Sequence, residues 1–388
     1  MKKTADAVIV GGGVMGCSIL FNLAARGMTN TVLLERDVLT SGSTSRSQAI
    51  LRMHYSNEVT TRLAWESLRL LKDFDQLTGN PSGYVRTGYF LIVGEHDRPA
   101  LEANVAMQKR VGVDTNVVSA SDVSEIAPVL AVREDEAFAY ERESGYADPY
   151  SVSTGFAWRA RDMGATLREG EPVEAVEVKG GKVSAVITSG GRIETPIAVI
   201  AAGPWSGPLL AGLGVEVPLR TVRHQVITLR RPERQVPSHP TIGDVVNDLS
   251  ARPDVGNMTW IGVGEEESIG PDDYNQGVDM DMVAQASRGL TVRMPGMARS
   301  LFRGGWSGLF TVTPDWHPIL DSVPGIEGLY FAVGFSGHGF KLSPMIGVVM
   351  SELILEGRST SVDISMLGLD RFEKGRLLRS RYSMSMLA

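Results

Sequence analysis

Apolar residues near the start of the chain form a continuous run, then a helical repeat, then a second run. Ala7–Val10 is uninterrupted apolar sequence, which is typical of a strand buried on both faces of a parallel sheet. Thr31–Leu34 is a second run of this kind. Between them, apolar residues recur with the spacing of one helix face at Ile19, Leu20, Leu23 and Ala24. The pattern predicts a strand–helix–strand unit over residues 5–36.

Both kinds of repeat continue through the rest of the chain. Helical spacing predicts helices over 59–74, 98–110, 121–126 (with Ser121 as N-cap), 149–163, 279–293 and 344–355. Apolar or alternating runs predict strands over 84–93, 138–140, 173–178, 183–187, 197–202, 216–230, 240–246, 256–263 and 329–333. The polar residues 264–277 are predicted to form a loop.

The order of these elements predicts two domains that interleave along the chain. Buried strands followed by helices occur in residues 1–84, 149–215 and 300–388, which together predict a discontinuous α/β, Rossmann-like nucleotide-binding domain. Antiparallel signals fall in residues 85–148 and 216–299, which predict an α+β domain built on an antiparallel sheet. A length of 388 residues agrees with two domains.

Composition narrows the class of protein. The formal net charge of −7, without a basic block, argues against a nucleic-acid partner. No apolar run approaches 18 residues, so no membrane span is expected. The single cysteine, Cys17, excludes an intrachain disulfide, and glycines at 11–13 interrupt what would be a signal peptide. We expect a cytoplasmic protein, and no group of residues has the spacing of a metal site.

Glycines between the first strand and helix indicate a dinucleotide site. Gly11, Gly13 and Gly16 form GxGxxG, in which they allow a tight turn, a close approach of backbone to pyrophosphate and close helix packing. Glu35 ends the second strand, where an acidic side chain binds ribose hydroxyls. The small polar residues 40–48 fit a phosphate- or ring-binding loop, and equally a solvated linker.

Four separated stretches resemble a family of FAD-dependent amino-acid and amine oxidoreductases, the D-amino-acid oxidase superfamily. The resemblance is strongest to its sarcosine oxidase and glycine oxidase branch. The stretches are the fingerprint through Arg36, STSRSQAILRMHY at 43–55, AAGPWS at 201–206, and TPDWHPILD with GFSGHGFK within 313–341. The resemblance implies FAD, lying between the nucleotide domain and an antiparallel substrate-binding domain.

The resemblance also implies which residues contact the cofactor. In the fingerprint and the polar loop they are Gly11, Gly13, Val14, Met15, Gly16, Glu35, Arg36, Ser43, Thr44 and Ser45. In the later stretches they are Val173, Ala202, Gly203, Trp205, Gly308, Gly337, His338, Gly339, Phe340 and Lys341.

Four residues are candidates for the substrate site. By resemblance, Arg52 and Lys341 bind a substrate carboxylate from two sides; the alternatives are a surface ion pair for Arg52 and a helix-start lysine for Lys341. His54 and His338 are the histidines expected to face the site, although a packed core position suits each equally well.

Two departures from the family pattern affect the expected chemistry. Gly308 stands where monomeric sarcosine oxidase attaches its flavin through a cysteine, so we expect noncovalent FAD. The oxidases activate oxygen with a lysine in a central strand, whereas this chain has no lysine between Lys182 and Lys341, and Thr259 or Trp260 takes the corresponding place. The electron acceptor is therefore either O₂ or a redox carrier.

The sequence favours an oxidoreductase that acts on the C–N bond of a small amino acid, preferably a secondary amine of the sarcosine or proline kind, to give an imine. A 2-hydroxy-acid oxidoreductase would use the same carboxylate contacts. A third hypothesis is a flavin-bearing electron-relay subunit of a larger complex, and either a homo- or a hetero-oligomer is compatible with the sequence.

Overall fold

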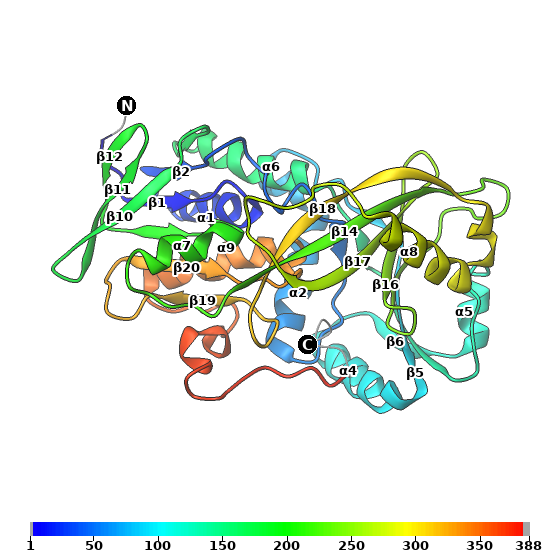
Figure 1. The fold of residues 1–388 in the computed structure, drawn as a ribbon. Helices are drawn as coiled ribbons and strands as arrows, with labels where there is room; N and C mark the ends of the chain where they lie inside the picture. Colours follow the sequence, from blue (N-terminus) through cyan, green and yellow to red (C-terminus); the bar gives the residue numbers. More distant parts are fainter. Residues whose placement is uncertain (1–2, 383–388) are drawn as a thin grey trace.

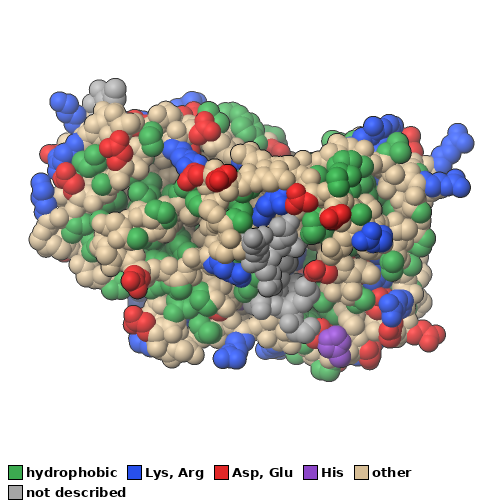
Figure 2. All heavy atoms as spheres, viewed as in Figure 1, with side chains coloured by type: hydrophobic (Ala, Val, Ile, Leu, Met, Phe, Trp, Pro, Cys, Tyr) green, Lys and Arg blue, Asp and Glu red, His purple; other side chains and the backbone are tan. Residues whose placement is uncertain are grey.

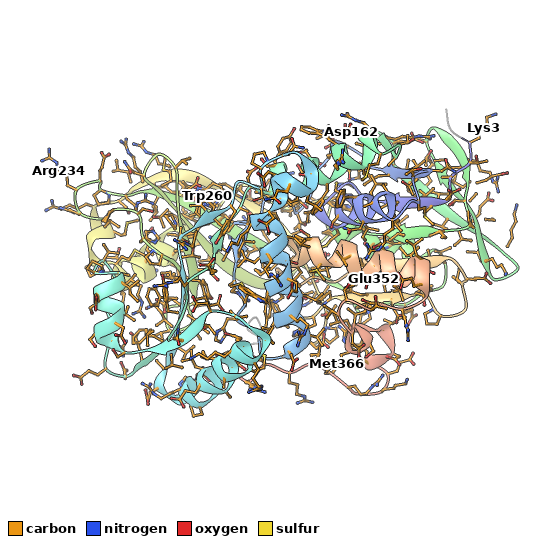
Figure 3. The ribbon with its side chains drawn as sticks, turned by 180° about the vertical axis from the view of Figure 1, so that it is seen from behind. Lys3, Asp162, Arg234, Trp260, Glu352 and Met366 are labelled. Carbon is orange, nitrogen blue, oxygen red and sulfur yellow. The ribbon has the colours of Figure 1, made fainter. Side chains whose placement is uncertain are left out.

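The computed structural model describes residues 3–382, apart from the side chains of residues 264–267. The molecule is elongated and has two halves, one around the N-terminal strands and one around a large sheet (Figure 1). Lys3 and Arg234 lie at opposite ends of its long axis (Figure 3). Acidic and basic side chains are interspersed over both halves on the face drawn in Figure 2. None of the described helices is long and apolar enough to cross a membrane.

The first half is built on a six-stranded sheet. Its order is β19 (Ile319–Ser322), β20 (Leu329–Val333), β13 (Ala198–Ile200), β1 (Ala7–Val10), β2 (Thr31–Leu34) and β9 (Thr166–Arg168). All neighbours are parallel except β19 and β20. The strands predicted from apolar runs at both ends of the chain therefore belong to one sheet, in which β13 lies between β20 and β1.

Alternation along β1 explains how this sheet is covered. Ala7 and Ile9 pack in a core with residues of α1 (Val14–Ala25), α2 (Glu58–Lys72), α6 (Pro149–Asp162) and α9 (Gly339–Glu356). Val8 and Val10 pack on the other face, against a three-stranded sheet of β10 (Val173–Lys179), β11 (Lys182–Thr188) and β12 (Gly191–Glu194). Side chains that point alternately to both faces are all apolar because both faces are buried.

The second half is built on an eight-stranded sheet. Its order is β18 (Leu301–Val312), β14 (Arg220–Arg230), β17 (Met258–Ser268), β16 (Leu249–Asp254), β15 (Thr241–Asp244), β5 (Tyr89–Gly94), β7 (Glu136–Glu141) and β6 (Thr115–Val118). Only β15 and β5 pair in parallel. One face packs on α5 (Ala120–Ile126) and α8 (Met280–Arg293), and the other packs in part on α4 (Arg98–Val111).

Short elements connect the two halves. The small sheet of β3 (Ile50–Leu51), β8 (Gly145–Tyr146) and β4 (Val85–Arg86) joins segments that are far apart in the sequence. The remaining helices are α3 (Phe74–Thr78), α7 (Ser206–Ala211) and the 3₁₀ turns η1 (Glu95–Asp97), η2 (Gly203–Trp205), η3 (Pro295–Arg299), η4 (Ser365–Leu367) and η5 (Leu369–Arg371).

The predicted fold class, a Rossmann-like α/β unit with a largely antiparallel second sheet, is confirmed, but several strand predictions need correction. The strand predicted over 84–93 is interrupted at Gly88, whose φ of 72° no strand residue adopts. The strands β6, β9, β12, β16, β18 and β19 lie outside the predicted strands, and β17 continues to Ser268, where we expected a loop. The predicted boundary at residue 300 assigns β18 to the nucleotide-binding part, whereas β18 pairs along its length with β14 in the large sheet. The division into domains otherwise remains a prediction.

Two helix ends also differ from their predictions. The N-cap of α5 is Ser119, which forms a capping box with Asp122, instead of Ser121. Helix α9 begins at Gly339, five residues before the predicted start at Pro344. A proline at this position cannot donate to the carbonyl of Phe340. The Ser343 hydroxyl donates to that carbonyl instead, at 2.8 Å, so the helix tolerates the proline.

Candidate active site

A cavity of about 610 Å³ lies where the two sheets meet. The carboxyl ends of β1 and β2 contribute Val10 and Leu34 to its lining, and β18 contributes residues 308–311. The end of β20 and the following turn contribute residues 332–340 with gaps. Ligands of open α/β sheets bind outside the carboxyl ends of the strands, so the cavity has the position expected for a cofactor.

Two positions of the N-terminal glycine turn have no room for a side chain. Gly11 has a φ of 112°, and a Cβ there would lie 2.5 Å from the carbonyl oxygen of Ala201. A Cβ on Gly16 would lie 1.9 Å from the carbonyl oxygen of Gly11. Gly13, the N-cap of α1, makes no side-chain cap hydrogen bond. The turn thus brings the positive end of a helix to the cavity with backbone alone, which suits a phosphate.

The polar segment at 40–48 belongs to the site and is not a solvated linker. The Thr44 hydroxyl accepts from the N–H of Val14 at 3.1 Å, and the Ser43 hydroxyl donates to the carbonyl of Leu309 at 2.8 Å. These contacts tie the start of α1 to β18 across the cavity. Ser43 and Thr44 line the cavity, whereas Ser45 does not.

Charged residues surround the outer part of the cavity. Glu35 accepts from the N–H of Gly12 at 2.7 Å, so its carboxylate is fixed beside the glycine turn. Arg36 lies over the Trp205 ring, with its guanidinium carbon 3.8 Å from the ring centroid. Asp272 accepts from Trp205 at 2.7 Å and from Arg36 at 3.0 Å, and these two contacts hold the pKa of Asp272 below its ordinary value. Sequence reasoning gave no signal for Asp272.

Most of the predicted cofactor-binding residues line this cavity. They are Gly11, Gly13, Val14, Met15, Glu35, Arg36, Ser43, Thr44, Val173, Ala202, Gly203, Trp205, Gly308, Gly337, Gly339 and Phe340. Gly16, Ser45, His338 and Lys341 do not line it. The lining also holds His224, which no motif in the sequence indicates. His224 stacks on Phe310 with ring centroids 4.3 Å apart, and burial lowers its pKa to about 4.

A second cluster, which we call the cation cluster, lies behind the turn at 336–341. It consists of Arg52, Tyr55, His338 and Lys341, all buried. The Arg52 guanidinium lies 4.6 Å from the centroid of the Tyr55 ring, and its Nη2 is 3.4 Å from His338 Nδ1. Lys341 Nζ is 3.5 Å from the carbonyl oxygen of Gly337. Two cations from segments almost 300 residues apart are therefore buried around one histidine, and a surface ion pair is excluded for Arg52, which is 7% exposed.

Burial and mutual repulsion shape the protonation of the cation cluster. Burial, and then the charge of Arg52, lower the pKa of Lys341 well below its ordinary value. Burial, and then the charges of Lys341 and Arg52, lower the pKa of His338 in the same way, so this histidine is neutral. A bound anion would offset the repulsion between the two cations, which makes the cluster suited to a carboxylate.

His54 lies on the far side of Arg52. Its backbone carbonyl accepts from Arg52 Nη1, whereas its ring contacts the Tyr382 hydroxyl, 2.5 Å from Nε2. The Nδ1 atom is 3.9 Å from the buried Glu141 carboxylate. Burial lowers the pKa of His54 to about 3, with a smaller contribution from Arg52. The structure thus groups Arg52, His338 and Lys341, whereas the His54 ring points away from them toward Tyr382 and Glu141.

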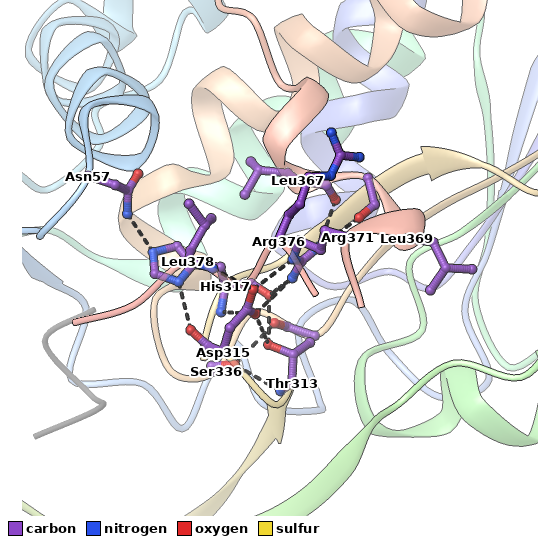
Figure 4. A network of polar contacts seen from close by, with 12 residues as sticks. Asn57, Thr313, Asp315, His317, Ser336, Leu367, Leu369, Arg371, Arg376 and Leu378 are labelled. Carbon is purple, nitrogen blue, oxygen red and sulfur yellow. Dashed lines mark hydrogen bonds and ion pairs between the residues drawn. The ribbon is translucent and has the colours of Figure 1, made fainter. Parts of the chain in front are cut away.

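A buried polar network supports the turn at residues 336–341 from the side opposite the cation cluster (Figure 4). Asp315 and Arg371 form a two-bond ion pair at 2.8 and 2.9 Å, and each side chain is 1% exposed. The network continues through Thr313, whose N–H donates to the Ser336 hydroxyl at 3.2 Å. His317 Nε2 is 2.7 Å from Asn57 Nδ2. The TPDWHPILD motif gave a signal for Asp315 and His317, whereas no local pattern indicated Arg371.

Thr259 and Trp260 are the candidates for the position at which the resembling oxidases carry their oxygen-activating lysine. The region around these two residues holds bulky side chains and side chains with hydrogen-bond or ion-pair partners. Trp260 packs edge-on against Trp306 at 4.8 Å and lies in the half that contains the large sheet (Figure 3). Thr259 is buried and hydrogen-bonds to His239 at 2.9 Å. Two arginines of the large sheet, which could replace the lysine as a positive charge, have acidic partners: Arg223 pairs with Asp279, and Arg252 pairs with Asp254 at 2.9 Å.

The fold places a cavity at the carboxyl ends of a Rossmann-like sheet, with a buried cluster of cationic side chains next to it. Residues 6–353 match the DAO family, described as FAD dependent oxidoreductase, and the chain belongs to this family. Membership in a family of FAD-dependent oxidoreductases agrees with what the resemblance of the four sequence stretches implied. The glycine turn, the α1 terminus and Glu35 fit this cofactor, because they offer backbone donors to a pyrophosphate and a carboxylate to a ribose.

Comparisons with individual proteins agree with this assignment. The chain is 27% identical to human mitochondrial sarcosine dehydrogenase over 92% of its length, and spans 40% of that protein. It is 26% identical to sarcosine oxidase subunit beta of Rhodobacter capsulatus, over 97% of this chain and 91% of the subunit. Its structure resembles L-proline dehydrogenase from P. horikoshii with a TM-score of 0.90 and 27% identity, over 97% of this chain and 100% of that chain. Glycine oxidase from Geobacillus kaustophilus, at 24% identity and a TM-score of 0.83 over 95% and 99% of the two chains, shows the shared fold.

Proposed function

We propose that the protein oxidises the C–N bond of a small amino acid, preferably a secondary amine of the sarcosine or proline kind, to an imine. The observation that carries the proposal is the joint burial of Arg52 and Lys341 beside the turn that lines the cofactor cavity. The similarities to a sarcosine dehydrogenase, a sarcosine oxidase subunit and an L-proline dehydrogenase support this substrate class.

Each residue of the cation cluster has a distinct role in the proposal. Arg52 and Lys341 hold the carboxylate from two sides and so fix the orientation of the neighbouring carbon. His338 keeps the Arg52 guanidinium in place through its Nδ1, and Tyr55 supports the same group with its ring face. FAD, when bound, supplies the flavin ring that accepts two electrons from the substrate. The apolar burial of the cluster excludes water and strengthens the contact between carboxylate and cations.

The function is tested by anaerobic titration of the holoenzyme with an amino-acid panel. We expect sarcosine or L-proline to bleach the flavin absorbance, and glycine to do so more slowly. Bleaching by lactate but not by any amine would assign the protein to 2-hydroxy-acid oxidation instead. Bleaching by none of these compounds would contradict the proposal.

The alternative of a relay subunit rests on the similarity to sarcosine oxidase subunit beta, which covers 91% of that subunit. Copurification of the tagged chain from its native host distinguishes the two proposals. A holoenzyme that turns over without any other polypeptide favours the self-sufficient enzyme, and amine oxidation restored only by a copurifying chain favours the subunit.

We infer that electrons leave to a carrier and not to O₂. Reduction of oxygen is fast where a positive charge stabilises the superoxide that forms first. The sequence has no lysine between Lys182 and Lys341, and both Arg223 and Arg252 are paired with acidic side chains. Turnover with a soluble quinone should therefore be at least ~10-fold faster than turnover in air-saturated buffer, as expected if about 1.4 kcal/mol of stabilisation is missing. Comparable rates with both acceptors would contradict this inference.

A further inference from the structure

The segment from Ser365 to Tyr382, which we call the strap, runs from the first half of the molecule to the substrate side (Figure 1). Its start is fixed by the buried pair of Arg371 with Asp315 (Figure 4). Further along, the N–H of Leu378 donates to the Asp315 carboxylate at 3.3 Å. The strap is thus anchored before it reaches the cation cluster.

The far end of the strap lies against the segment that carries Arg52. The N–H of Arg381 donates to the Ser56 hydroxyl at 3.0 Å. The Tyr382 side chain is 6% exposed and packs in the apolar cluster of Tyr89 and Leu91. Its hydroxyl is therefore held at one place, 2.5 Å from His54 Nε2.

His54 connects this hydroxyl to Arg52. The His54 ring is fully buried, and its Nδ1 has no hydrogen-bond partner among the described residues. Among the residues that the structure describes, Tyr382 therefore supplies the hydrogen bond that orients the ring, at Nε2. The backbone carbonyl of His54 accepts a hydrogen bond from Arg52 Nη1. A change in the orientation of residue 54 would therefore move the Arg52 guanidinium.

We propose that Tyr382 is a positioning residue for substrate binding: its hydrogen bond to His54 sets the place of the Arg52 guanidinium. The proposal rests on the proposed function, in which Arg52 binds the substrate carboxylate. Tyr382 does not touch the substrate, so its effect falls on carboxylate binding and leaves the rate at saturation nearly unchanged.

The test is Tyr382→Phe in the full-length holoenzyme, with acetate as a carboxylate that lacks an amine. We expect the acetate Kd, measured from the change in flavin absorbance, to rise about fivefold, the effect of losing one neutral hydrogen bond. KM for the amine should rise similarly, while kcat, flavin content and Tm stay at wild-type values. Tyr84→Phe is the matched control, because the Tyr84 hydroxyl donates to the carbonyl of Glu143 outside the cluster.

A double-mutant cycle checks that the effect passes through His54. In a His54→Gln background, Tyr382→Phe should add less than twofold to the acetate Kd, because the shared contact is already lost. An unchanged Kd in Tyr382→Phe, or full additivity in the cycle, overturns the proposal. A wild-type protein that binds neither acetate nor an amino acid instead overturns the proposed function, so the two failures are distinguishable.

Discussion

The cofactor cavity contains a glycine turn and a small polar segment that bring backbone to its surface, whereas the cation cluster beside it consists of large charged and aromatic side chains. In the cavity, Gly11 and Gly16 have neighbours that leave no room for a Cβ. In the cluster, Arg52 and Lys341 are buried by partners that come from distant parts of the chain. The first region is fixed by backbone sterics, and the second by long-range contacts between side chains. Substitutions should therefore affect them differently.

Removing either cation should have the largest effect and should separate the two regions most clearly. Arg52→Gln and Lys341→Met each leave the substrate carboxylate with one cation in a buried site, which costs about 2–4 kcal/mol. We expect kcat/KM for flavin reduction to fall roughly 30- to 1,000-fold, while FAD remains bound. Arg62→Gln, in an exposed pair with Glu58 on α2, is the control. Normal reduction by both variants would show that the carboxylate binds elsewhere.

A substitution in the cofactor cavity should have the opposite pattern, because it should weaken FAD binding and leave the substrate site intact. Glu35→Gln removes a charge beside the glycine turn, where a charge-assisted hydrogen bond to ribose contributes about 1.5–3 kcal/mol. The FAD Kd, measured by fluorescence on reconstitution of the apoprotein, should rise about 10- to 150-fold. Saturating FAD should restore wild-type kcat. Glu66→Gln on α2 should leave the Kd unchanged, and equal Kd values for both variants would remove Glu35 from the cofactor site.

The contrast between the regions also explains what the sequence could predict. β1, α1, β2 and the glycine turn follow from local patterns, because the apolar spacing and the glycine motif that mark them lie within residues 7–34, although the carbonyl that crowds Gly11 belongs to Ala201. The start of α9 was mispredicted because the Ser343 hydroxyl replaces the donor that Pro344 lacks. β16 was missed because Arg252 and Pro253 interrupt its apolar pattern, although Pro253 still pairs with Thr259.

Within the site, residues marked by local motifs could be predicted from the sequence, and residues held by long-range contacts could not. Most of the predicted cofactor residues line the cavity, since motifs mark them. Arg371 and Tyr382 have no periodicity or motif, and their partners Asp315 and His54 lie 56 and 328 positions away. His54 was grouped with the catalytic candidates because sequence does not show to which side of Arg52 its ring turns.

Alkaline pH should weaken carboxylate binding earlier than an ordinary lysine would allow. Burial and Arg52 lower the pKa of Lys341, so in the free enzyme its charge is lost as pH rises through this lowered value. Above that pH the acetate Kd should rise by up to about tenfold per pH unit. Acetate is the suitable ligand because it does not titrate in this range. In Lys341→Arg the rise should be absent below pH ~11, since arginine stays protonated. The same rise in both proteins would assign it to another group.

The smallest expected effect concerns the link between protein and cofactor. Gly308 stands where a relative carries its attachment cysteine, and a Cβ there would lie 2.9 Å from the Cβ of Arg46. Cys17 is buried with its Sγ 3.5 Å from the carbonyl of Gly12, and burial raises its pKa, so no reactive thiolate forms. Acid precipitation should therefore release all flavin colour into the supernatant, with the absorbance spectrum of free FAD. Colour retained in the pellet would contradict noncovalent binding. His224 would then be the first residue to locate by peptide mapping, because it lines the cavity and pairs across the strands with Gly308.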